Sequence, residues 1–196
     1  FSREAQTVEK LDHPNIVKLH EVGAKDDTPF MVMEFIDGHD LGDVIKEHGS
    51  MLLEQLLPIL SEVASALDYA HGQNIVHRDI TPQNLLISYQ GEVKISDFGI
   101  SKARSEPSFT QAGVIKGKLS DLSTEQALGE PVDHRADIYA LGLVFHETLT
   151  GKRVFQFDSD LEAIRAIPKM EIEPLINARP EVPEELNRIV MKCLER

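Results

Sequence analysis

Apolar residues recur at helical spacing along much of the chain. The clearest case is residues 52–71, where leucines and alanines follow one another at intervals of three and four. Residues 135–149 are apolar almost throughout, as in a helix that is buried on most sides. The apolar stripe of 52–71 comprises Leu53, Leu56, Leu57, Leu60, Ala64 and Leu67. The predicted helices cover residues 2–11, 40–49, 52–71, 135–149 and, with breaks at prolines, 160–195.

Short apolar runs between turn residues predict four strands. The first two, 16–24 and 29–35, flank a polar turn, and the second two, 85–88 and 92–96, flank Tyr-Gln-Gly. A hairpin alone is marginal in water, so we expect further strands upstream of Phe1. A few strands followed mainly by helices predict an α+β fold. Because both chain ends lie inside helical patterns, we interpret the sequence as a fragment of a longer protein.

Composition and charge narrow the function classes. The 196 residues are 41% apolar, which is enough for one substantial core. The net charge of −13 argues against nucleic acid or an anionic membrane as the main partner. Cys193 is the single cysteine, so no internal disulfide can form, which fits a reducing, cytoplasmic location. The most apolar stretch, 51–67, contains Glu54, Pro58 and Glu62 and predicts a buried helix, not a bilayer span.

Polar side chains cluster at both ends of the second predicted hairpin. His77-Arg78-Asp79 precedes it, with Asn84 five residues after the aspartate, and Asp97-Phe98-Gly99 follows it. This pairing of HRDxxxxN with DFG resembles the signature of eukaryotic-type protein kinases. The segments HPNIV, HRDITPQN and DHRADIYALG are most similar to the bacterial serine/threonine protein kinases.

The resemblance covers the whole chain and implies a protein kinase-like fold in two parts. Residues 1–36 would form a partial N-lobe that ends in the hinge, and residues 37–196 a C-terminally truncated, mostly helical C-lobe. The Gly-rich phosphate loop and the strand lysine of the family do not occur in this sequence. The catalytic glutamate Glu4 would pair with that lysine in the parent protein. We therefore expect the fragment alone to bind nucleotide poorly and to be inactive.

What the resemblance implies for chemistry is transfer of the ATP γ-phosphate to serine or threonine hydroxyls of proteins. Asp79 would accept the hydroxyl proton and orient the substrate, while Asn84 and Asp97 would bind Mg²⁺. Arg78 would bind a negative charge in the loop that follows, and Asp137 would hold the backbone of the catalytic loop.

The resemblance also implies a nucleotide pocket. His77 and Phe98 would stack inside the molecule, with Val8 and Leu19 above them. The adenine would meet the backbone groups of Glu34 and Ile36, with Met33 as gatekeeper and Leu86 beneath the ring.

Thr81 stands where serine/threonine kinases carry a catalytic-loop lysine. In the family this lysine also bonds a threonine that follows a glycine, seven residues before the glutamate of Ala-Pro-Glu. Here Gly117 is followed by Lys118, and Glu125 comes seven residues later. We therefore predict an exchange, in which Lys118 supplies the positive charge and Thr81 the hydroxyl.

Three functions remain open from the sequence. Intact Asp79, Asn84 and Asp97 favour an active protein kinase, with ATP and protein substrates as partners. Several departures from the family favour a pseudokinase that acts as a binding or scaffold module. A small-molecule phosphotransferase is a third reading. A membrane anchor elsewhere in the parent protein is compatible with each. The departures are Thr81, Asp121 where the family has tyrosine, and Thr124 where it has proline.

Overall fold

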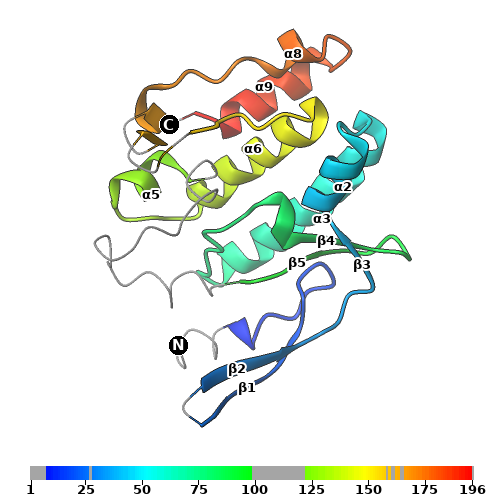
Figure 1. Ribbon diagram of the computed structural model, residues 1–196, viewed down its shortest axis with the longest axis vertical. Helices are drawn as coiled ribbons and strands as arrows, with labels where there is room; N and C mark the ends of the chain where they lie inside the picture. The colour runs from blue at the N-terminus through cyan, green and yellow to red at the C-terminus, as the bar shows by residue number, and fades with distance from the viewer. Residues whose placement is uncertain are drawn as a thin grey trace.

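The computed structural model describes residues 8–26, 28–98, 122–157, 159, 162–163 and 166–195. It combines short strands with a larger helical part, which confirms the predicted α+β class (Figure 1). The strands are β1 Leu19–Lys25, β2 Thr28–Met33, β3 Gly38–Asp40, β4 Leu85–Ser88 and β5 Val93–Ile95. The helices are α2 Leu41–His48, α3 Leu53–Gly72, α5 Thr124–Leu128, α6 Arg135–Thr150, α8 Leu175–Ala178 and α9 Glu184–Cys193, with 3-10 turns η1 Pro82–Asn84 and η3 Ile167–Lys169.

The strands form two small antiparallel sheets. Strands β1 and β2 form one hairpin, which lies at the end of the molecule away from α6 and α9 (Figure 1). The second sheet has the order β3-β4-β5 and includes β3, which the sequence pattern did not predict. Gly38 lies opposite Ser88 in this sheet, and a Cβ atom there would fall 2.0 Å from the carbonyl oxygen of Ile87. Only glycine allows the two backbones to approach so closely.

The stretch before β1 pairs with β5 instead of extending β1. The N–H of Ile95 donates to the carbonyl of Asn15, and the carbonyl of Ile95 accepts from the N–H of Val17, both at 2.9 Å. The side-chain amide of Asn15 donates to Glu62 of α3 at 2.7 Å and to the carbonyl of Val93 at 2.8 Å. The predicted strand 16–24 was therefore wrong over its first residues. The turn at Asn15 is anchored to the helical part of the molecule.

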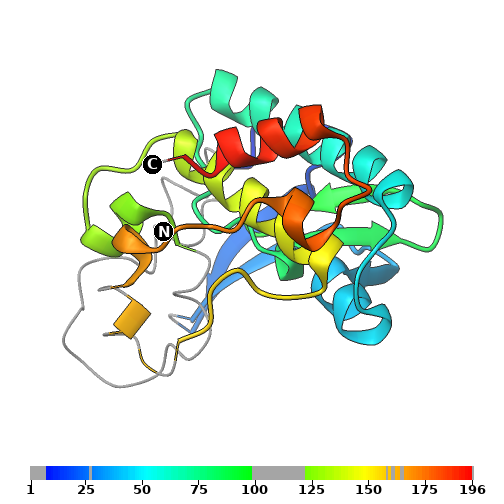
Figure 2. The same ribbon diagram turned by 90° about the horizontal axis from the view of Figure 1, so that it is seen from above.

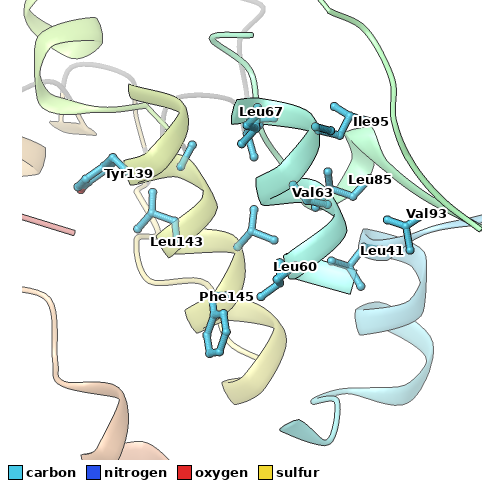
Figure 3. Close-up of a cluster of buried hydrophobic side chains, with 14 of the residues drawn as sticks. Leu41, Leu60, Val63, Leu67, Leu85, Val93, Ile95, Tyr139, Leu143 and Phe145 are labelled. Atoms are coloured by element: carbon cyan, nitrogen blue, oxygen red, sulfur yellow. The ribbon is translucent and has the colours of Figure 1, made fainter. Parts of the chain in front are cut away.

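Helix α3 lies at the centre of the core. It packs against α6 on one side and β5 on the other, and α6 also packs against α9 (Figure 2). Figure 3 shows labelled α3 side chains between those of α6 and those of the β4–β5 hairpin. The predicted stripe was wrong at Leu57, which is 40% exposed, and at Ala64, which is also exposed. The buried positions of α3 are Leu56, Leu60, Val63, Ala66, Leu67 and Ala70.

Helix α3 ends at Gly72, one residue after the predicted end of this helix, and is followed by Asn74, whose backbone is left-handed with φ of 60°. Within the described residues, no helix is long and apolar enough to cross a membrane.

A buried histidine on α6 gives the fold a pH dependence. His146 is 8% exposed; its Nε2 bonds the carbonyl of Glu173 at 3.2 Å, while its Nδ1 has no partner among the described residues. Burial lowers the pKa of His146 below its ordinary value of 6.5, although the Glu173 carbonyl opposes this. The unfolded chain therefore binds this proton more readily, and stability falls as the pH drops through 6.5 toward the lowered pKa.

We predict that replacing His146 with glutamine reduces the acid sensitivity of folding. The free energy of unfolding, measured by denaturant titration at about pH 7.5 and about pH 5.5, should drop on acidification by less in the variant than in the wild type. Exposed His48→Gln is the matched control and should keep the wild-type difference. Equal differences for wild type and His146→Gln would contradict the prediction.

Candidate active site

The loop that carries His77, Arg78 and Asp79 is held by one buried carboxylate. Asp137, in the first turn of α6, is 1% exposed. Its Oδ2 accepts the N–H of His77 at 2.8 Å, and its Oδ1 accepts the N–H of Arg78 at 2.7 Å. The predicted support of this loop by Asp137 is confirmed. A further contact, from His71 Nε2 to Asp137 Oδ2 at 2.7 Å, was not predicted.

The ring of His77 links this loop to the end of β5. Its Nε2 lies 2.8 Å from the carbonyl oxygen of Ser96, which can only accept, so Nε2 carries the proton. Its Nδ1 then accepts the N–H of Asp79, at 3.2 Å. The ring also packs edge-on against Phe98, with centroids 4.5 Å apart, which confirms the predicted pairing. The two ring nitrogens of His77 therefore hold the backbone at Asp79 and at Ser96, the residue before Asp97.

Asn84 connects the segment that carries Asp79 to the segment that carries Asp97, through two hydrogen bonds. Its side-chain Nδ2 donates to the carbonyl of Asp79 at 2.7 Å. Its own carbonyl accepts the N–H of Ser96 at 2.9 Å, one residue before Asp97. Since Nδ2 is engaged, Oδ1 is the Asn84 atom left for a cation. The structure thus links the segments that carry Asp79, Asn84 and Asp97, while the roles of these residues stay predictions.

Two non-glycine residues at this site have left-handed backbone. Arg78 has φ of 69° and Asp97 has φ of 62°. Such conformations cost on the order of 1–3 kcal/mol each and persist where the surroundings determine them. They flank the linked segments, Arg78 directly before Asp79 and Asp97 directly after Ser96. This is the pattern expected of a site that orients functional groups.

Two oxygen ligands of the right kind are available for magnesium. Asn84 is partly buried at the end of η1, and Asp97 is exposed after β5. No group of three or more His, Cys, Asp or Glu suited to a metal occurs within the described part of the chain. Mg²⁺ in phosphoryl-transfer sites takes one or two protein ligands and completes its shell with phosphate and water. The donor set therefore fits a magnesium–nucleotide complex.

The predicted hinge has an ion pair that sequence reasoning missed. The Glu34 carboxylate bonds Lys94 Nζ of β5 at 2.7 and 2.9 Å and accepts the N–H of Lys18 at 3.1 Å. Partial burial acts to raise the pKa of Glu34, but Lys94 and the Lys18 N–H outweigh it, and the pKa lies below its ordinary value. The Glu34 N–H donates to the Lys18 carbonyl, so its own carbonyl is the backbone group left for a ligand.

Of the other predicted nucleotide contacts, Met33 and Leu86 lie in strands, and Ile36 lies in the segment between β2 and β3. Met33, at the end of β2, is 40% exposed, and Ile36 is partly buried. Leu86 lies in β4 between Asp40 and Lys94 in register and is also partly buried. Their contact with adenine stays a prediction. The candidates Glu4 and Lys118, with Gly99, Gly117 and Asp121, lie outside the described residues.

Thr81, at the position of the missing catalytic-loop lysine, is 7% exposed and directly precedes η1. Its carbonyl accepts the N–H of Asn84 at 3.0 Å.

Thr124, at the position of the family's proline, is the first residue of α5, where proline is favoured but not required. The helix forms with threonine there because Ser123 and Gln126 make a capping box.

Gln126 is a site residue that was not predicted. Its Nε2 donates to the carbonyl of Arg78 at 2.8 Å, while its Oε1 accepts the N–H and the hydroxyl of Ser123 at 3.0 and 3.1 Å. The Ser-x-x-Gln spacing is a readable signal for the helix start. Nothing in that spacing indicates the bond to Arg78, which lies 48 residues away.

Comparison with known proteins agrees with this geometry. A family model described as "Protein kinase domain" matches residues 1–196. The chain is 41% identical to the probable serine/threonine-protein kinase PknB of Lactococcus lactis over 98% of its length. It is 41% identical to the tyrosine-protein kinase MasK of Myxococcus xanthus over 99%, and 39% identical to the serine/threonine-protein kinase PrkC of Bacillus subtilis over 98%. It spans 31%, 32% and 30% of these three relatives, respectively.

Proposed function

This chain belongs to the protein kinase family, and from that premise we propose that its parent protein is an ATP-dependent protein serine/threonine kinase. The observation that carries the proposal is the hydrogen-bonded connection from Asp79 through Asn84 to Ser96, the residue directly before Asp97. It joins a candidate proton acceptor to two candidate magnesium ligands. Phosphoryl transfer depends on such positioning more than on covalent chemistry.

Each residue has a defined task in this proposal. Bound MgATP would supply the phosphoryl group. Asp79 orients the substrate hydroxyl and accepts its proton, while Asn84 and Asp97 hold the cation. Arg78 Nε is buried and has no partner among the described residues, which suits an anionic group on the segment that follows. Adenine would rest between the hinge and β4, in contact with Met33, Glu34, Ile36 and Leu86.

We further propose the roles of the two lobes and the cellular location that the sequence predicts. Residues 1–36 serve as the nucleotide-side lobe and 37–196 as the substrate-side lobe. The site works in the cytoplasm, where ATP is available, on protein substrates.

The choice of serine and threonine over tyrosine needs a direct test, because one of the relatives above is called a tyrosine-protein kinase. The full-length protein is incubated with γ-labelled ATP, itself and a generic basic protein, and the labelled amino acids are separated after acid hydrolysis. Phosphoserine or phosphothreonine supports the proposal. Phosphotyrosine alone would contradict the acceptor class. Binding of MgATP without any labelled protein would favour the pseudokinase, and label found only on small molecules the third reading.

The exchange of Thr81 and Lys118 stays our proposal for the missing catalytic-loop lysine. We expect Lys118→Ala to lower kcat for protein phosphorylation by about tenfold or more, because the substitution removes the positive charge that would contact the transferred phosphate. Lys116→Ala, two residues away, is the matched control and should have little effect. A Lys118→Ala protein with normal kcat would rule the exchange out. Partial recovery in the double variant Thr81→Lys, Lys118→Thr would support it.

A further inference from the structure

Gln126 contacts two segments that are far apart in the sequence. It lies in the first turn of α5 and caps that helix through Oε1, which accepts both donors of Ser123. Ser123 is 1% exposed, so this contact is inside the protein. The other end of the amide, Nε2, donates to the carbonyl of Arg78 at 2.8 Å. The cap uses only the oxygen of Gln126, and the nitrogen is committed to the loop that carries Asp79.

The bond to Arg78 completes the restraint of one peptide plane. The plane between Arg78 and Asp79 carries the Arg78 carbonyl, bound by Gln126, and the Asp79 N–H, which donates to His77 Nδ1 at 3.2 Å. A planar peptide rotates as a unit, so holding both ends fixes the backbone angles on either side of it. One of these angles is ψ of Arg78, a residue that also has a left-handed φ of 69°. The other sets the direction from which the Asp79 side chain leaves the backbone.

We propose that Gln126 is a positioning residue for phosphoryl transfer, which couples the start of α5 to Asp79 by fixing the Arg78–Asp79 peptide plane. The proposal rests on the kinase function proposed above. Asp137 already holds the N–H groups of His77 and Arg78, so the loop is folded without Gln126. What Gln126 adds is orientation of the plane next to the proton acceptor. The position of the Gln126 amide nitrogen is thereby transmitted to the catalytic loop.

The two ends of the Gln126 amide can be separated by substitution. In Gln126→Glu, a carboxylate oxygen still accepts from Ser123 and keeps the cap, but no donor faces the Arg78 carbonyl. Gln126→Met removes both functions at similar size and without charge. Ser123→Ala is the matched control, because it weakens the cap and leaves the Gln126–Arg78 bond in place.

The test measures kcat, KM for ATP and thermal unfolding of these variants in the full-length protein. We expect Gln126→Glu to unfold near the wild-type temperature and to lose about tenfold or more in kcat with unchanged KM for ATP, since small misplacements of a reacting group are costly. Ser123→Ala should unfold at a lower temperature than the wild type and keep a kcat within about twofold of it.

A pH profile distinguishes positioning from a structural role. Protonation of the carboxylate introduced by Gln126→Glu restores a donor toward the Arg78 carbonyl, so the ratio of this variant's activity to wild-type activity should rise as the pH falls from about 8 to about 6. The ratio for Gln126→Met should stay flat. A flat ratio for both, or a wild-type kcat in Gln126→Glu, would overturn the inference.

Failure of the kinase proposal itself is recognised separately. If the wild type transfers no phosphate, the hydrogen-exchange rate of the Asp79 N–H still reports how firmly the Arg78–Asp79 peptide plane is held. Faster exchange in Gln126→Glu than in Ser123→Ala would support the positional role, and equal rates would overturn it.

Discussion

Replacing Asp79 with asparagine should lower kcat for protein phosphorylation by about a hundred- to ten-thousandfold, the usual contribution of a positioned proton acceptor. The substitution keeps the size of the side chain, and two backbone contacts that hold the loop do not depend on the carboxylate: the Asp79 N–H toward His77 and the Asp79 carbonyl toward Asn84. The loop should therefore keep its shape. Affinity for MgATP should be unchanged, because in the proposed arrangement Asn84 and Asp97 hold the cation.

The measurement is single-turnover phosphorylation together with nucleotide binding on the same samples. Asp68→Asn, an exposed position on α3, is the matched control and should behave as wild type. An Asp79→Asn protein that phosphorylates at the wild-type rate would exclude Asp79 as the proton acceptor. Loss of both binding and transfer would instead indicate that the substitution had changed the loop.

The largest effect on stability is expected at Asp137. This carboxylate is itself buried; it accepts hydrogen bonds from the N–H groups of His77 and Arg78 and bonds His71. Asp137→Ala leaves these buried donors without an acceptor, which should lower the free energy of unfolding by about 3–5 kcal/mol. That is a large fraction of the total stability of an ordinary domain, so loss of phosphorylation should follow.

Denaturant titration monitored by circular dichroism measures this effect. Asp133→Ala is a suitable comparison, because Asp133 is exposed: it loses a solvent ion pair with Arg135 and the acceptor of the Arg135 N–H, and it should destabilise the protein far less than Asp137→Ala. Asp137→Asn keeps one acceptor oxygen and should fall between wild type and Asp137→Ala. If Asp137→Ala were as stable as Asp133→Ala, the buried carboxylate would not be what holds the loop.

Elements with a local signature could be predicted from the sequence. The hairpin of β4 and β5 and the helix α6 appear close to the predicted residues, because the turn residues and the apolar run that define them are contiguous. The stripe on α3 was misplaced because this helix carries more leucines than one face can bury, so Leu57 stays exposed and Val63 takes a core position. Strand β3 was missed since three residues that include a glycine carry no periodic signal.

The candidate site was predictable only in part, for a related reason. The order of His77, Asp79, Asn84 and Asp97 can be read along the chain, and resemblance to a family gave their roles. The partners that hold them come from distant segments, such as Lys94 for Glu34, 60 residues away. A single sequence contains no spacing rule for such pairs. They follow from the packing of whole elements and became visible only in three dimensions.

The backbone of Ile95 has one more consequence, for where the protein can be cut. A polypeptide that began at residue 37 would retain β5 but lose Asn15 and Val17, which pair with the N–H and the carbonyl of Ile95. Glu62 would lose its amide partner at the same time. An uncovered strand edge recruits other chains, so the isolated larger part should self-associate. The proposed boundary between the lobes, at residues 36 and 37, is therefore not the boundary of a soluble folding unit. The soluble unit begins before Asn15.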